Sequence, residues 1–329
     1  MRRSAAWLLS LAVMAALAAC APAPKVVTST ALDFMDTVSM VTLYERDASA
    51  AQRVFDACRD LDGLLDMRDP SSEISRLNGA DGVSVPISSD TEALLRIGVE
   101  AARISDGLFD ITVGTASLLW DFPGGVIPDK AALDAAVSHV GIDNLAVGDG
   151  RASITNGGVV DMGALAKGYA LDIAQEILAG QGVANALVNL GGSVLALGVR
   201  PDGQPWRVGV QKPFGNADEL LGVIEAPNIK VVTAGLYQRS FELDGMLYHH
   251  ILDPRAGMPA DTDVWSATII ADSGVWADAY STICVLLGSR RAMALVEDTD
   301  GVECILALSD GTILTSGGIG AKVSFYAVD

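Results

Sequence analysis

The sequence is poor in histidine, cysteine and basic residues. Its 329 residues include three histidines and four cysteines, and 22 lysines and arginines stand against 41 acidic residues, for a formal net charge of −19. This charge argues against nucleic acid as a partner, because such binding depends on neutralising phosphates with lysine and arginine. A phosphorylated ligand must instead be held locally, by a metal ion, a helix N-terminus or single well-placed cations.

Several catalytic and metal-binding motifs are absent. The chain has no Gly-x-Ser-x-Gly elbow of serine hydrolases, no His-Glu-x-x-His of zinc proteases and no P-loop. Beyond Cys20, the cysteines Cys58, Cys284 and Cys304 are spaced like no metal motif. We expect them to be buried thiols, with at most one disulfide among them.

Long apolar runs are missing except at the N-terminus. Two arginines precede an uncharged run from Ala5 to Ala19, which is too short for a comfortable bilayer crossing and is typical of a signal peptide. The run ends in Leu-Ala-Ala-Cys20, which resembles a lipobox, the signal for attaching lipid to a cysteine. An ordinary signal peptide with an incidental cysteine is the alternative.

These features predict a processed, membrane-attached protein. We expect a signal peptide at 1–19, a lipidated tether at 20–33 and one folded domain at 34–329. Lipid on Cys20 would hold the chain on the periplasmic face of a bacterial membrane, with inner and outer membrane left open.

Helical and strand patterns are mixed along the body of the chain. Residues 35–44 alternate like a strand, several strands are expected within 183–270, and short strands close the chain. Because the two patterns do not alternate regularly, we predict an α+β fold with mixed sheets and packed helices. The predicted helices are 48–67, 90–104 with Asp90 as a plausible cap, 161–178 and 273–287.

The last of these helices carries a carboxylate in an apolar setting. Residues 275–284 are apolar nearly all round, so the helix should be buried, and Asp278 and Thr282 share one of its faces. A buried carboxylate needs a cation, a metal or several donors, and oxygen ligands of this kind suit Mg²⁺. The structural alternative pairs Asp278 with a basic residue and bonds Thr282 to a helix carbonyl.

The segment 160–169 combines an acid and a lysine at a predicted helix start. Asp161 is expected at the N-terminus and Lys167 within reach, where the free amides and the helix dipole favour an anion such as phosphate. Gly163 and Gly168 would permit close approach. A capped helix with a surface lysine is the alternative.

Two of the three histidines, His249 and His250, lie on a predicted strand that runs into a turn. Neighbours on a strand face opposite sides, so at most one is expected to point into a given pocket. Such a histidine is a candidate general base, and a structural hydrogen bond is its alternative role. The glycine-containing segments 106–114 and 189–193 are predicted strands that could approach a flat ligand closely, with bulges and turns as the alternative.

Taken in order, these segments resemble the ApbE family, the FAD:protein FMN transferases once associated with thiamine biosynthesis. The similarity spans most of the body, from Met35-Asp36-Thr37 through residues 72–78 (Ser-Glu-Ile-Ser-Arg-Leu-Asn) to residues 277–282 (Ala-Asp-Ala-Tyr-Ser-Thr). It implies an enzyme of ApbE-like, T-fold-like architecture. Family members are often lipoproteins, in agreement with Cys20.

The resemblance also implies a reaction. Mg²⁺ holds the FAD pyrophosphate while a threonine or serine hydroxyl of an acceptor flavoprotein attacks the FMN-side phosphorus, and AMP departs. The usual acceptors are exported or membrane-bound subunits of redox complexes. The implied metal ligands are the Ala164 carbonyl, Asp278 and Thr282, with Ser281 where many relatives have a second acid. His250 and Asp278 are the implied catalytic residues. The implied FAD contacts are Met35, Arg68, Leu108, Phe109, Asp110, Asp161, Lys167 and Ile251.

This chain departs from the family pattern at two positions. Arg68 stands about where many relatives have an aromatic residue, and Ala234 replaces the usual serine. The planar guanidinium of Arg68 can still stack on a flavin ring. Two alternative functions stay open, namely an FAD pyrophosphatase that yields FMN and AMP, and a flavin-binding lipoprotein without turnover.

Overall fold

The computed structural model describes residues 26–44, 49–216 and 218–328. The predicted signal peptide and Cys20 lie outside these residues. Within them, no helix is long and apolar enough to cross a membrane. Cys58, Cys284 and Cys304 are buried free thiols, as expected.

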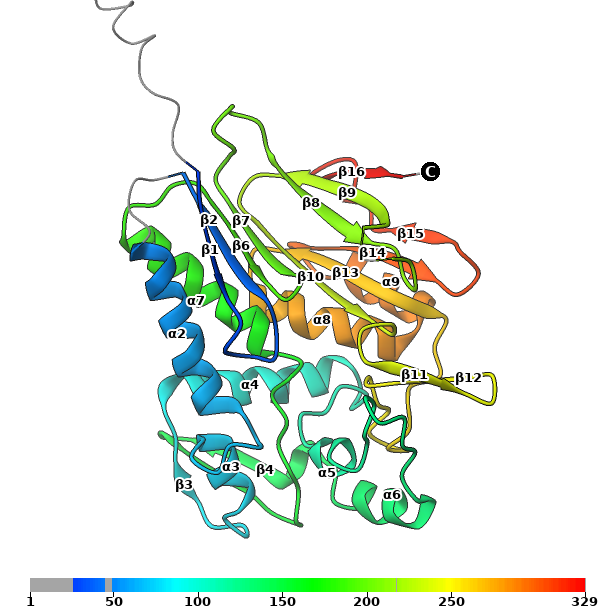
Figure 1. The fold of residues 1–329 in the computed structure, drawn as a ribbon. Helices are drawn as coiled ribbons and strands as arrows, with labels where there is room; N and C mark the ends of the chain where they lie inside the picture. The colour runs from blue at the N-terminus through cyan, green and yellow to red at the C-terminus, as the bar shows by residue number, and fades with distance from the viewer. Residues whose placement is uncertain (1–25, 45–48, 217, 329) are drawn as a thin grey trace, which may run out of the picture.

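An eight-stranded antiparallel sheet forms the centre of the molecule (Figure 1). Its middle strands are buried at nearly every position, because both faces of the sheet are covered. In spatial order the strands are β1 (Val27–Ala31), β2 (Ser39–Leu43), β6 (Ala186–Leu190), β7 (Ser193–Leu197), β10 (Ile229–Gly235), β13 (Val264–Ala271), β14 (Val302–Leu308) and β15 (Ile313–Thr315).

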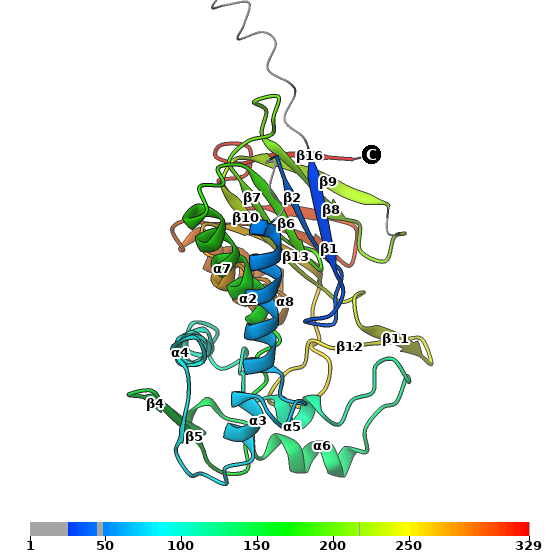
Figure 2. The ribbon, with the colours of Figure 1, turned by 60° about the vertical axis from the view of Figure 1, so that its left-hand side comes forward.

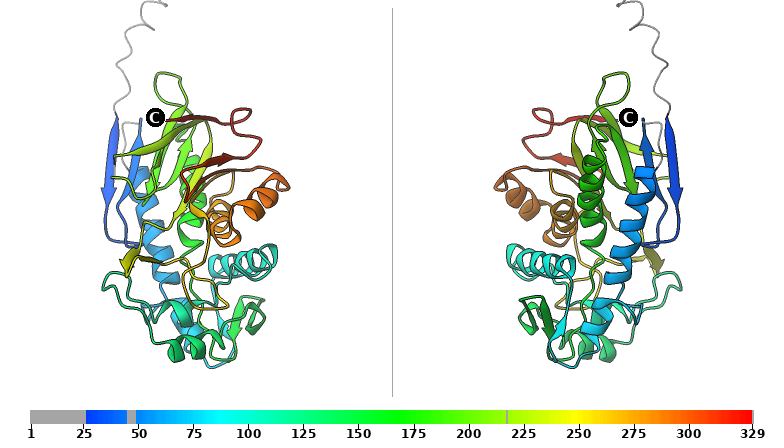
Figure 3. Two further views of the ribbon diagram at one scale, coloured as in Figure 1. Left: turned by 90° about the vertical axis from the view of Figure 1, so that its right-hand side faces the viewer. Right: turned by 90° about the vertical axis from the view of Figure 1, so that its left-hand side faces the viewer.

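Helices cover one face of this sheet and a small second sheet covers the other (Figures 2 and 3). In the helical layer, α8 packs on β10 and β13, and α7 packs between α8 and α2. The helices of this layer are α2 (Ser49–Leu65), α7 (Ala166–Gly180), α8 (Gly274–Leu287) and α9 (Ser289–Glu297). The second sheet contains β8 (Trp206–Gln211), β9 (Leu220–Ala226) and β16 (Ser324–Ala327).

The remaining elements lie beyond the lower ends of α2, α7 and α8 in Figure 1. They surround the loops that carry most of the predicted site residues. They comprise α3 (Glu73–Asn78), β3 (Val85–Pro86), α4 (Ser89–Ile104), α5 (Gly114–Ser117), α6 (Lys130–Val137), η1 (Ile142–Asn144), β4 (Leu145–Gly148), β5 (Arg151–Ile154) and the hairpin of β11 (Ser240–Leu243) and β12 (Met246–His249).

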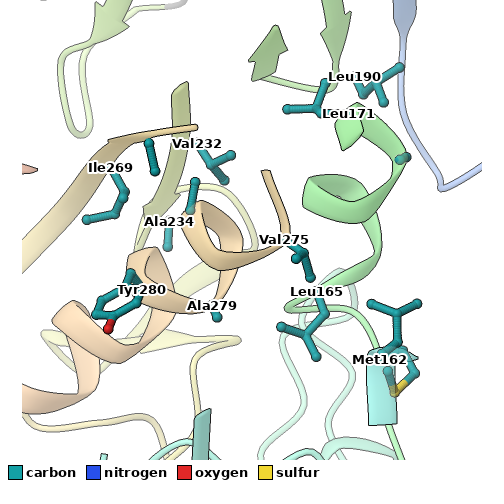
Figure 4. Packing of buried hydrophobic residues seen from close by; sticks show 14 of the residues in the cluster. Met162, Leu165, Leu171, Leu190, Val232, Ala234, Ile269, Val275, Ala279 and Tyr280 are labelled. Atoms are coloured by element: carbon teal, nitrogen blue, oxygen red, sulfur yellow. The ribbon is translucent and has the colours of Figure 1, made fainter. Parts of the chain in front are cut away.

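The core between sheet and helices fixes α7 against α8. Figure 4 shows Leu165, directly before α7, next to Val275 of α8, with Leu171 further along α7 and Val232 and Ile269 on the neighbouring sheet strands. All five side chains are at most 4% exposed. The α+β prediction is confirmed, and the four predicted helices exist.

Several boundaries differ from the predictions. The folded body begins at Val27, within the predicted tether and before Phe34, because β1 pairs with β2 along its whole length. The cap of α4 is Ser88, whose side chain accepts a hydrogen bond from the Thr91 amide, while Asp90 instead accepts from the hydroxyl of Tyr169.

Two segments near the site that were predicted as helix or strand are loops and turns instead. The helix expected from Asp161 begins at Ala166, so Asp161 lies in the preceding loop. Residues 106–112 form turns and bends rather than a strand, because Asp106 and Gly107 adopt positive φ angles, and Val113 makes only an isolated bridge with Val159.

Candidate functional site

A cavity of about 710 Å³ lies where the start of α7 and the side of α8 that carries Asp278 meet the surrounding loops. Every site residue predicted from the folded body lines it, although these residues come from positions spread over nearly the whole chain. They are Met35, Arg68, Leu108, Phe109, Asp110, Asp161, Ala164, Lys167, His250, Ile251, Asp278, Ser281 and Thr282.

Asp278 is the buried acid of this cavity, with 6% of its surface exposed. Its Oδ2 accepts a hydrogen bond from the Gly168 amide at 2.8 Å. Burial raises the pKa of Asp278, while the charge of Lys167 and the Gly168 amide lower it. Among the described residues no ion pair forms at Asp278, so the structural alternative of a basic partner is not realised.

A glycine contact brings α7 this close to α8. A Cβ atom on Gly168 would lie 2.2 Å from the Gly274 carbonyl oxygen and 2.6 Å from the Asp278 Cβ. Asp172 of α7 reinforces the contact, since its carboxylate accepts hydrogen bonds from the amides of Gly274 (2.7 Å) and Val275 (2.9 Å). Lys230, 4% exposed, lies 2.9 Å from Asp172 and balances its charge. The first turn of α8 is thus fixed on α7.

The groups around Asp278 offer oxygen ligands. Thr282 lies one turn further along α8, and Ala164 lies in the turn before α7. Ser281 donates its hydroxyl proton to the Asp278 carbonyl at 2.7 Å, the back-bond that the structural alternative gave to Thr282. The described residues contain no group of three or more histidines, cysteines or acids that could hold a metal. This donor set fits Mg²⁺, which retains water and substrate phosphate oxygens as ligands.

Asp161 and Lys167 flank the start of α7. The Asp161 carboxylate accepts hydrogen bonds from the Gly163 amide at 2.9 Å and from the Ser117 hydroxyl at 3.2 Å. Lys167 is in the first helical turn and faces the cavity. A cation beside a helix N-terminus favours a bound anion here.

His250 lies in the cavity wall. Its buried Nδ1 has no hydrogen-bond partner among the described residues. Burial, followed by the charges of Arg239, His249 and Lys167, lowers the pKa of His250 to about 4, so the ring is neutral at pH 7. As expected for strand neighbours, His249 faces elsewhere, with its Nε2 3.3 Å from the Ala260 carbonyl oxygen.

Another part of the cavity wall consists of turns that are held by side chains. The Met35 amide, at a φ of 53°, donates to Asp62 at 3.1 Å, and the Phe109 amide donates to the Ser105 hydroxyl at 2.9 Å. Asp110 accepts from the amide and the hydroxyl of Thr112, and burial raises its pKa. These bonds present Phe109 and its neighbours to the cavity.

Other lining residues were not predicted from the sequence. Trp120 and Phe122 stack with centroids 5.1 Å apart, and the Trp120 Nε1 donates to the Gly257 carbonyl at 2.9 Å. Aromatic residues make up only 5% of the chain, so two of them within three positions could have marked this segment as part of a binding site. Arg239 also lines the cavity, as does Asp62, and no sequence pattern marks either residue.

An α+β fold with an acid, a lysine and a neutral histidine around one large cavity defines an enzyme acting on a sizeable charged small molecule. Such convergence of polar groups on an otherwise mixed cavity is typical of catalytic sites. The ApbE family model matches residues 35–306. The chain therefore belongs to the ApbE family.

Individual relatives agree with this assignment. The chain is 31% identical to an FAD:protein FMN transferase of Klebsiella pneumoniae (strain 342), over 86% of this chain and 89% of the relative. It is 32% identical to an enzyme of the same name from Treponema pallidum (strain Nichols), over 84% and 81%.

Solved structures show the same fold. The ApbE protein of Thermotoga maritima superposes with a TM-score of 0.81 at 30% identity, covering 89% of this chain and 97% of that one. The apo form of the flavinyl transferase ApbE from Pseudomonas stutzeri gives a TM-score of 0.78 at 27% identity, over 89% and 95%.

Proposed function

We propose that this enzyme transfers FMN from FAD to a threonine or serine hydroxyl of an acceptor protein, with Mg²⁺ bound and AMP released. The observation that carries the proposal is Asp278, a buried acid fixed by the Gly168 amide, which lines one cavity together with Lys167 and His250. The buried Nδ1 of His250 has no hydrogen-bond partner among the described residues. The relatives named FAD:protein FMN transferase support the same chemistry.

The metal would lie between α7 and α8. Asp278 and Thr282 would ligate it with side-chain oxygens, Ala164 with its carbonyl, and Ser281 with its hydroxyl oxygen, whose proton is already donated to the helix. When bound, Mg²⁺ would neutralise phosphate charge and act as a Lewis acid. One carboxylate makes this a weak site for a free cation, so we expect metal and FAD to bind more tightly together than apart.

Lys167 and Arg239 supply the positive charge for a pyrophosphate. Both line the cavity near His250, and both lower the pKa of that histidine. A neutral imidazole with a free nitrogen accepts a proton, so His250 is placed to take the proton of the acceptor hydroxyl as it attacks phosphorus. Bound phosphates would raise the pKa of His250 towards neutrality and make it a better base.

The remaining lining residues suit the two ring systems of FAD. The volume of about 710 Å³ lies within the usual range for small-molecule sites, roughly 300–1,000 Å³. Phe109, Trp120 and Phe122 provide apolar surface, and Met35, Leu108 and Ile251 extend it, while the exposed Arg68 stands at the rim. Asp110 and Asp161 offer acceptors for ring or ribose donors.

An assay with FAD, Mg²⁺ and threonine-bearing flavoprotein subunits tests this function. A fluorescent acceptor band, together with one AMP per FMN transferred, is expected. Asp278→Asn keeps the shape of the side chain and its contact with Gly168, and should lower the rate by at least about 100-fold. AMP released without an acceptor would identify a pyrophosphatase instead. Bound FAD with neither product would identify a carrier.

We also propose that the protein is an exported lipoprotein attached through Cys20, with acceptors on the same side of the membrane. The motif around Cys20 supports it. Cys20→Ser should move the protein from the membrane fraction to the soluble fraction while leaving the activity of the purified enzyme unchanged. Membrane association that survives the substitution would contradict the lipid anchor.

A further inference from the structure

The loop that carries Asp161 and Ala164 to the cavity has little regular structure of its own. Residues 160–165 contain no helix and no strand, and they connect the bridge at Val159 to the start of α7. Val160 is completely buried. A loop at this place must be held by neighbours, because its position decides where the Asp161 carboxylate and the Ala164 carbonyl lie.

One edge of the loop is held by main-chain bonds. The Gly114 amide donates to the Val159 carbonyl at 3.0 Å, and the Asp161 amide donates to the Ile111 carbonyl at 2.7 Å. These bonds tie the loop to the segment 111–114, which directly follows the Leu108–Asp110 turn of the cavity wall.

The other edge is held by the side chain of Asn78. Its Nδ2 donates to the Val160 carbonyl at 3.0 Å, and its Oδ1 accepts from the Val160 amide at 2.7 Å. Within the part of the chain that the structure describes, no other group bonds the Val160 main chain. The carboxamide thus replaces the neighbouring strand that would otherwise pair with this residue, and asparagine is suited to it because one side chain carries both a donor and an acceptor.

Asn78 is itself held firmly from outside the cavity. It is the last residue of α3, whose Ile74 and Leu77 are completely buried. Ser72 caps the helix, and Glu73 accepts hydrogen bonds from the amide and the hydroxyl of Ser88 at the start of α4. None of residues 72–78 lines the cavity. Asn78 therefore meets the site indirectly, through its contact with Val160.

We propose that Asn78 is a positioning residue that sets FAD affinity by fixing Val160, and through it Asp161 and Ala164. The inference rests on the proposed function in taking FAD as the ligand. The fixation of the loop by Asn78 does not depend on that function. Loss of a partner that orients a ligand-bearing group commonly weakens binding by about 10- to 100-fold. The same loss should affect the KM for FAD more than kcat, because Asn78 touches neither phosphate nor the attacking hydroxyl.

The test compares Asn78→Leu with Asn185→Leu. Asn185 also bonds the main chain, accepting from the Val199 amide at 2.8 Å, but it does not line or adjoin the cavity. Quenching of flavin fluorescence should show a Kd for FAD raised at least about tenfold in Asn78→Leu and changed by less than about twofold in Asn185→Leu. Hydrogen exchange in the ligand-free protein should be faster at Val160 and Asp161 in Asn78→Leu alone.

Two further variants keep the inference open to refutation. Asn78→Asp retains the acceptor for the Val160 amide and loses the donor, so it should give an intermediate Kd even if the leucine variant does not fold. In a protein that already carries Asp161→Ala, Asn78→Asp should raise the Kd for FAD by less than about twofold, because the two substitutions act through the same loop. Unchanged exchange and unchanged affinity in the Asn78 variants would overturn the inference. If the unmodified protein did not bind FAD, the proposed function would fail, and exchange alone would decide the role of Asn78.

Discussion

The two sides of the cavity are built in different ways. On the helix side, Lys167 and the Asp278–Thr282 turn come from α7 and α8, which are held together by a glycine contact and by Asp172, whose carboxylate accepts from two amides of α8. On the turn side, Met35, the Leu108–Asp110 stretch and His250 come from loops, and single polar side chains hold most of them. The helix side is fixed by two regular helices and several bonds between them, whereas the turn side depends on individual side-chain bonds.

We expect low pH to destabilise the turn side before the helix side. Burial lowers the pKa of His249 and of His250 from 6.5 to about 4. Between pH 6.5 and pH 4 these histidines bind protons in the unfolded chain but not in the folded chain. The stability that the neutral, buried histidines contribute is therefore complete above pH 6.5 and is lost as the pH falls towards 4. Each histidine should cost about 2 kcal/mol of unfolding free energy at pH 5.

Urea unfolding at pH 7 and pH 5 measures this loss. His249→Asn and His250→Asn should each reduce the difference between the two pH values by about 2 kcal/mol. The matched control is His139→Asn, at a half-buried surface position, which should keep the full difference. The same pH difference in all three variants and the unmodified protein would show that the turn side is not the acid-sensitive one.

The difference between the two sides also decides what the sequence predicts. Helical spacing placed Asp278 and Thr282 on one face and showed that the helix is buried, because a helix repeats its geometry at every turn. The turns follow no such period. Val160 depends on Asn78, 82 positions away, and the cap of α4 is Ser88 rather than the neighbouring Asp90. Local pattern cannot identify such partners, so the resemblance to the family, and not periodicity, placed Met35 and the Leu108–Asp110 stretch in the site.

A methyl group at the helix contact should damage the helix side. In Gly168→Ala the new Cβ would lie 2.2 Å from the Gly274 carbonyl oxygen, so α7 and α8 must separate and the Gly168 amide must leave Asp278. We expect a loss of about 1–3 kcal/mol in unfolding free energy and, because ligating groups move, a rate about 100-fold lower. The Mg²⁺ concentration needed for half-maximal rate should rise.

Gly180→Ala is the matched control for this helix. Gly180 is the last residue of α7, and a Cβ there meets no atom within 4 Å. The Gly180→Ala variant should have an unchanged or slightly higher free energy of unfolding and unchanged activity. If Gly168→Ala also left the metal requirement unchanged, the spacing of α7 and α8 would not control the metal site.

The smallest expected effect comes from removing one hydroxyl on the turn side. Ser105 is completely buried and accepts from the Phe109 amide, which Ser105→Ala would leave without a partner, at a cost of about 1–3 kcal/mol. Because Phe109 lines the cavity, we expect a severalfold higher Kd for FAD but an unchanged Mg²⁺ requirement, the reverse of Gly168→Ala. Ser316→Ala removes a buried hydroxyl that accepts from the Cys304 amide away from the cavity, and should lower stability similarly with FAD affinity intact. A raised Mg²⁺ requirement in Ser105→Ala would mean that the two sides respond as one unit, because a turn would then move the metal ligands as well.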